Sequence, residues 1–110
     1  MRVRLILENG GHAITKRLHL SEVPAVGSFV LAERARMVVS VELHGERGEA
    51  DVYLREDADD LLMQVIPEAH LAHIELMKRY GWDVEEEDAL RAWLMLRIER
   101  QDDDEPAEPS

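Results

Sequence analysis

The chain has 110 residues, of which 45% are hydrophobic and 34% are charged, a composition typical of one folded domain. It contains no cysteine, so disulfides, thiolate metal sites and cysteine nucleophiles are excluded. The net charge is −11, but it is divided unevenly: residues 1–56 hold eight basic and eight acidic residues, whereas residues 57–110 hold five and sixteen. The whole excess of negative charge therefore belongs to the second half of the chain.

The start of the chain alternates apolar and polar residues and includes two arginines, unlike the uninterrupted apolar stretch of a secretory signal. No apolar run approaches the ~20 residues that cross a bilayer. We therefore expect a cytoplasmic protein with no membrane partner.

The first two predicted strands form a hairpin. Residues 2–8 have the two-residue period of a half-buried strand. Asn9-Gly10-Gly11 supplies residues that accept positive φ, which favours a hairpin turn. Residues 12–20 form the second strand, in which Lys16 interrupts the apolar face and indicates an edge position or a bulge.

Three further short strands follow a loop at residues 23–27, which has the pattern Pro-x-x-Gly. They are predicted at residues 29–32, 37–43 and 50–55, the last two joined by a glycine-containing turn at 44–49. Five short strands should curl to protect their edges. Strand number, strand spacing and the Pro-x-x-Gly loop resemble the SH3-like class, which implies a five-stranded antiparallel small barrel or meander.

The period changes near residue 57, and the fold class is therefore α+β. Residues 57–66 fit a short helix with an acidic N-terminus, although an edge strand is an alternative. Pro67 is suited to start a second helix that Gly81 ends. Asp83 and Glu86 have capping-box spacing before a third helix. Its apolar positions are Ala89, Leu90, Trp93, Leu94, Leu96 and Ile98.

These elements predict one globular domain over residues 1–100, with a β part (1–56) and a helical part (57–100). Residues 101–110 contain five acidic residues and two prolines, and no apolar residue larger than alanine. Such a segment can bury almost nothing, so we expect a disordered acidic tail.

His70 and His73 are weak candidate metal ligands, because residues three apart share a helix face, and Glu68 and Glu75 lie nearby as possible oxygen ligands. Catalytic zinc usually needs three protein ligands, and the H-E-x-x-H arrangement is absent. Nucleophile elbows and phosphate-binding glycine loops are also absent. We therefore expect no catalytic, cofactor-binding or metal site, and a structural or solvent-exposed role for both histidines.

Six basic residues precede position 37 and could form one basic face: Arg2, Arg4, Lys16, Arg17, Arg34 and Arg36. Small barrels can bind nucleic acid through such a face, but a net charge of −11 repels a polyanion at long range. Scattered arginines more often serve solubility.

Large apolar residues around the second and third helices are the candidates for a protein interface: Tyr80, Trp82, Leu90, Trp93, Leu94 and Leu96. The apolar stripe of the third helix is wider than a coiled-coil seam, so it needs the barrel and the second helix together or a second chain. Tryptophan either pins a helix to its own core or anchors an interface.

The leading hypothesis is a non-enzymatic protein-interaction or assembly module, with the acidic helical half as the surface for a partner or for self-association. The alternative is a nucleic-acid-related regulator, in which the barrel binds RNA or DNA or the acidic half mimics DNA. A metal-dependent enzyme built on His70 and His73 is the third hypothesis.

Overall fold

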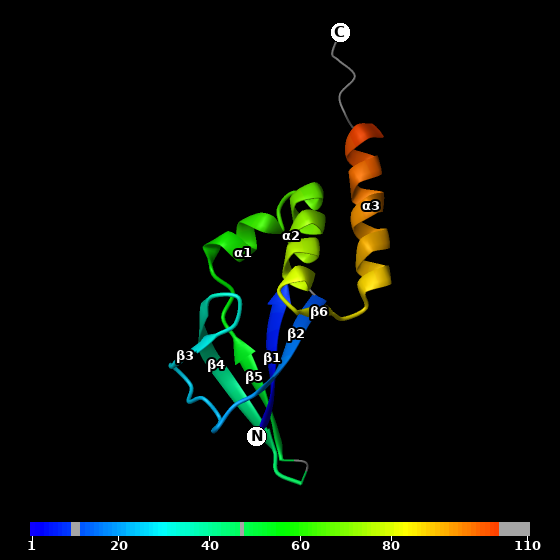
Figure 1. Cartoon of the computed structure of the whole chain (residues 1–110). Coiled ribbons are helices and arrows are strands. Elements are labelled where there is room, and N and C mark those ends of the chain that lie inside the picture. The colour runs from blue at the N-terminus through cyan, green and yellow to red at the C-terminus, as the bar shows by residue number, and fades with distance from the viewer. Residues whose placement is uncertain (10–11, 47, 104–110) are drawn as a thin grey trace.

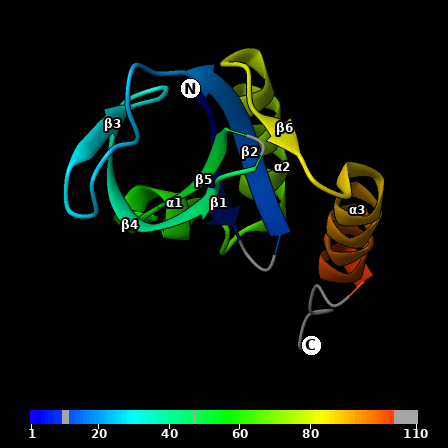
Figure 2. The ribbon, with the colours of Figure 1, turned by 90° about the horizontal axis from the view of Figure 1, so that it is seen from below.

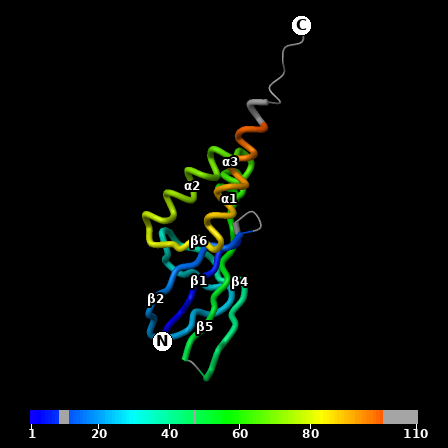
Figure 3. Tube along the Cα trace, turned by 90° about the vertical axis from the view of Figure 1, so that its right-hand side faces the viewer, coloured from blue at the N-terminus to red at the C-terminus, as the bar shows by residue number. Residues whose placement is uncertain are grey.

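The computed structural model of the chain describes residues 1–9, 12–46 and 48–103. Within these ranges a curled sheet of six strands carries three helices at one end (Figure 1; Figure 3). The strands are β1 (Arg2–Asn9), β2 (His12–His19), β3 (Phe29–Leu31), β4 (Ala35–His44), β5 (Glu49–Leu54) and β6 (Asp83–Val84). The helices are α1 (Ala58–Met63), α2 (Pro67–Arg79) and α3 (Glu87–Asp103).

The strand order is β3-β4-β5-β1-β2-β6, and the sheet curls into a half-barrel (Figure 2). The α+β class is thus confirmed, but the five-stranded antiparallel meander is wrong in two respects. The short β6 is a sixth strand, and β1 pairs in parallel with β5. The physical reason is the connection over residues 20–28, which carries the chain from β2 to the other edge of the sheet. From there β3, β4 and β5 return, and β5 meets β1 running in the same direction.

The main core packs against one face of the sheet. Val3, Leu5 and Leu7 alternate along β1 and are almost completely buried, as the two-residue period predicts. Met77 and Trp82, from the end of α2 and the segment after it, belong to the same buried cluster. The helical half therefore completes the core of the sheet.

The end of α2 positions Trp82. Gly81 has a φ of 92°, its N–H donates to the carbonyl of Lys78, and the N–H of Trp82 donates to the carbonyl of Met77, both at 3.1 Å. This is a Schellman ending, which requires a left-handed residue that glycine adopts easily. Lys16 donates its Nζ to the carbonyl of Tyr80 at 2.7 Å, which explains a lysine on an otherwise apolar strand face.

Several boundaries differ from those predicted. Residues 58–63 are helical, not an edge strand, and begin with a capping box between Asp57 and Asp60. The predicted box of Asp83 and Glu86 does not form, because Asp83 belongs to β6 and Glu86 has a φ of 51°. Helix α3 continues through Asp103, so residues 101–103 of the predicted tail are helical.

Three other predictions fall partly or wholly on undescribed residues. Residues 10 and 11 of the first hairpin turn are outside the described ranges, although Asn9 pairs with His12 on either side of them. The same holds for residue 47 within the predicted 44–49 turn, and for residues 104–110 of the predicted tail.

Candidate functional site

The six predicted basic residues do not form one face. Arg2, Arg4 and Arg17 line one groove formed by residues of β1, β2 and β5 together with His44. Lys16 contacts the end of α2, and Arg34 and Arg36 pair with acidic residues beside α1. Sequence position therefore grouped side chains that the fold separates.

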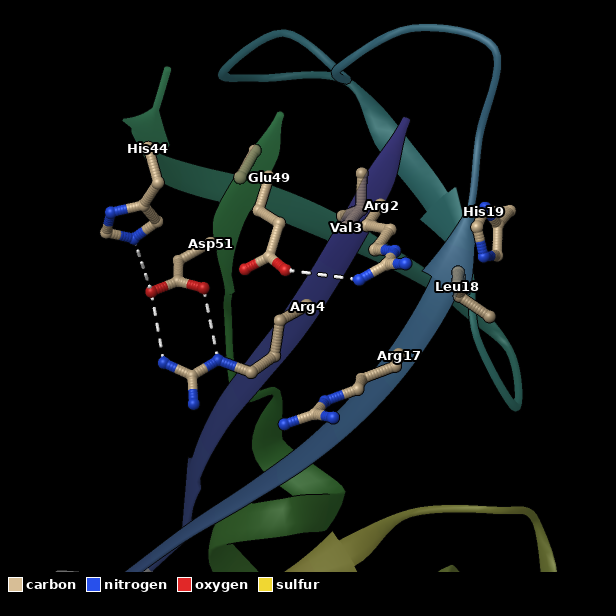
Figure 4. Close-up of a pocket in the computed structure, with 10 residues that line it drawn as sticks. Arg2, Val3, Arg4, Arg17, Leu18, His19, His44, Glu49 and Asp51 are labelled. Carbon is tan, nitrogen blue, oxygen red and sulfur yellow. Dashed lines mark hydrogen bonds and ion pairs between the residues drawn. The ribbon is translucent and has the colours of Figure 1, made fainter. Parts of the chain in front are cut away.

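The groove of Arg2, Arg4 and Arg17 has a volume of about 630 Å³ and is shown in Figure 4. Arg4 donates to both carboxylate oxygens of Asp51, from Nε at 3.1 Å and from Nη2 at 3.0 Å. His44 Nε2 lies 3.0 Å from Asp51 Oδ2. Burial by itself raises the pKa of Asp51, but the hydrogen bonds from Arg4 and His44 outweigh it and lower that pKa.

A second set of charges is buried where the helices meet the sheet. Arg36 donates to both carboxylate oxygens of Asp60, at 2.7 and 3.0 Å, and also to Glu33. Trp82 Nε1 donates to Glu33 at 2.7 Å. Burial alone raises the pKa of Asp60, but the bonds from Arg36 and from the backbone of Asp57 lower it to about 2. This network fixes α1 and Trp82 to the β3–β4 connection.

The two histidines of α2 are both largely buried. His70 is 1% exposed, and neither of its ring nitrogens has a hydrogen-bond partner among the described residues. His73 Nε2 lies 3.9 Å from Asp60 Oδ1, but Arg36 already binds that carboxylate. Burial lowers the pKa of both histidines. In the described part of the chain, no three His, Asp or Glu residues are placed to hold a metal ion.

The most exposed apolar segment is α1 and the turn that follows it. Leu61, Leu62, Met63, Val65 and Ile66, here called the 61–66 surface, are all at least 42% exposed, with Leu62 and Val65 at 66%. Helix α1 has only six residues, and its buried side chain is that of Asp60, which is 1% exposed. The large apolar side chains of this segment therefore face solvent.

A groove of about 680 Å³, lined mainly by residues of β1, β4 and β5, adjoins this surface at Leu61. Leu61 belongs to the 61–66 surface and also lines the groove, where it is joined by Ile6, Val39 and Tyr53. Among the described residues that line this acidic groove are three glutamates, Glu8, Glu42 and Glu56, and no lysine or arginine. Burial raises the pKa of Glu56, and the nearby charges of Asp60 and Glu8 add to this effect.

The predicted interface residues divide into two groups. Trp82, Leu90 and Leu94 are at most 2% exposed within this chain. Exposed residues are Tyr80, Trp93 and Leu96. Trp93 is 44% exposed, lies 6.2 Å from the ring of His12, and has the guanidinium of Arg97 over its face. Only the second group is accessible to a partner.

A scan against models of known families, a search of curated proteins and a search of solved structures each returned no match. Among the helices in the described ranges, none combines the length and apolarity needed to span a bilayer.

The sequence interpretation missed the 61–66 surface and the acidic groove as functional candidates. A signal was present: five of six consecutive residues are large and apolar, directly after three aspartates. Glu8, Glu42 and Glu56 come from three different strands or strand ends, so no local pattern could have grouped them.

Proposed function

We propose that this chain is a non-enzymatic protein-interaction module that binds a polypeptide segment carrying aliphatic side chains and at least one lysine or arginine. The observation that carries the proposal is the continuity of the 61–66 surface with the acidic groove through Leu61. Aliphatic side chains of the partner would cover the 61–66 surface, and its lysine or arginine would enter the acidic groove.

Two physical arguments support this choice of partner. Soluble monomers rarely expose a contiguous apolar patch without a use for it, and burying one leucine or valine contributes about 1.5–3 kcal/mol. The carboxylates of the groove repel one another. They therefore favour binding of a cation and disfavour an acidic partner. A second copy of this chain would bring another net charge of −11 and is therefore the weaker candidate.

The test uses a helical peptide made only of leucine and lysine, and its counterpart with glutamate in place of lysine. Isothermal titration with the full chain should show binding of the first peptide and none of the second. The double variant Leu62→Ser/Val65→Ser should bind about tenfold more weakly, because it removes exposed apolar contacts without opening the core. Val26→Ser/Leu31→Ser, at equally exposed positions elsewhere, is the matched control.

The charge contribution has its own pair of variants. Glu8→Gln/Glu42→Gln should bind the leucine–lysine peptide more weakly than wild type. Glu22→Gln/Glu46→Gln removes the same charge outside the groove and should bind it like wild type. Unchanged affinity in both Leu62→Ser/Val65→Ser and Glu8→Gln/Glu42→Gln would refute the proposal. A wild-type dimer in light scattering that Leu62→Ser/Val65→Ser converts to a monomer would also refute it, in favour of self-association.

A further inference from the structure

The pairing of β1 with its two neighbours places like charges opposite each other. Arg4 lies opposite Arg17 of β2 on one side and opposite Asp51 of β5 on the other. In the next row, Arg2 lies opposite His19 and Glu49. Like charges directly opposite on a sheet are destabilising, so the Arg4–Arg17 pair has a cost in the unliganded protein.

Among the described residues that line this groove, the two carboxylates are those of Glu49 and Asp51, both on β5. Asp51 is committed to Arg4 and His44, and Glu49 is 3.7 Å from Arg2. On the β2 side, Arg17 has no salt bridge or side-chain hydrogen bond with the described residues. Figure 4 shows its guanidinium extending below Arg4, with no acidic side chain between the two. The groove is therefore polarised, with unbalanced positive charge along β1 and β2.

We propose that the β1–β2 side of this groove binds the phosphate group of a small phosphorylated molecule, through Arg17 and Arg2. A phosphate has enough oxygens to accept from two guanidinium groups at once, which carboxylates match less well. The hydrogen bonds to Asp51 hold the guanidinium of Arg4 in place, so Arg4 adds positive charge beside the phosphate without binding it directly. A volume of about 630 Å³ is within the range of small-molecule sites.

A small ligand fits better than a nucleic-acid strand. A strand needs a track of several basic residues, but Lys16, Arg34 and Arg36 lie elsewhere and are already engaged. This site is also separate from the acidic groove. Along β1, Arg2 and Arg4 line the proposed phosphate site, whereas Ile6 and Glu8 line the acidic groove.

Pyrophosphate is the probe, added to isotope-labelled full chain while sodium chloride keeps the ionic strength constant. Amide resonances around Arg2, Arg17 and His19 should shift in a saturable manner, and the melting temperature should rise. In Arg17→Gln the affinity should fall at least about tenfold, because a charge-assisted hydrogen bond is lost. The same variant without ligand should melt no lower than wild type, since it removes the repulsion with Arg4.

Arg55→Gln, which removes an exposed arginine of the same half of the chain outside this groove, is the control and should bind pyrophosphate like wild type. The proposal is overturned if wild type shows no saturable shift at millimolar pyrophosphate, or if Arg17→Gln binds equally well. The assignment to a small ligand is overturned if a thymidine oligonucleotide binds more tightly than pyrophosphate.

Discussion

At the scale of single residues, Asp60 carries the largest structural role. Its carboxylate caps α1 by accepting from the backbone N–H of Asp57 at 3.0 Å, and it binds the guanidinium of Arg36 through both oxygens. Both side chains are at most 2% exposed. Removing one partner of a buried ion pair leaves the other charge without compensation, and this costs far more than the pair itself contributes.

Asp60→Asn should therefore lower the free energy of unfolding by about 3–5 kcal/mol, measured by urea denaturation. Asp59→Asn is the matched control, because its side chain is 76% exposed and should change stability by less than about 0.5 kcal/mol. Similar small losses in both variants would show that the Arg36 network does not hold the helices to the sheet.

At the scale of elements, α3 is attached to the molecule by a narrow contact. Leu90 and Leu94 pack against Ile74 of α2 in a small cluster separate from the main core. Elsewhere on α3 the large apolar side chains of Trp93, Met95 and Leu96 are exposed. The apolar stripe that the sequence predicts for this helix is thus only partly covered within the chain.

Leu94→Ala should destabilise the protein by about 2–4 kcal/mol and accelerate amide hydrogen exchange throughout α3. The reason is that it removes side-chain atoms that pack against Ile74 of α2 and leaves a cavity there. Leu96→Ala removes the same atoms two residues away, from a side chain that is 46% exposed, and should have little effect. Equal effects of the two substitutions would mean that α3 is not docked through Leu94.

At the scale of the whole molecule, buried histidines make stability depend on pH. Burial lowers the pKa of His70 and His73 from the ordinary 6.5, and the charges of His73, His12 and Arg97 add to this at His70. Below pH 6.5 the unfolded chain binds protons that the folded protein does not. The free energy of unfolding is therefore highest above about pH 6.5 and falls as the pH decreases. Asp60, whose pKa is lowered from 3.8 to about 2, adds a second loss between those values.

Urea denaturation between pH 7.5 and pH 5 should show this first loss in wild type and a much smaller one in His70→Leu/His73→Leu. His19→Gln, at an exposed histidine, should keep the wild-type slope. An unchanged slope in the double variant would assign the acid sensitivity to other groups.

Sequence alone determined the local structure of this protein. Alternation and turn residues predicted β1 to β5 but not the two-residue β6, Pro67 and Gly81 bounded α2, and the residue counts showed that the two halves differ in charge. Periodicity, turn residues and charge are local properties. Only the tertiary structure decided that β5 runs parallel to β1, that Trp82 is buried while Trp93 is exposed, and that Arg36 is buried while Arg17 lines a groove. These outcomes depend on contacts between residues far apart in the chain, such as Arg36 with Asp60. Two arginines or two tryptophans look alike in the sequence, so nothing local shows which partner each of them will contact.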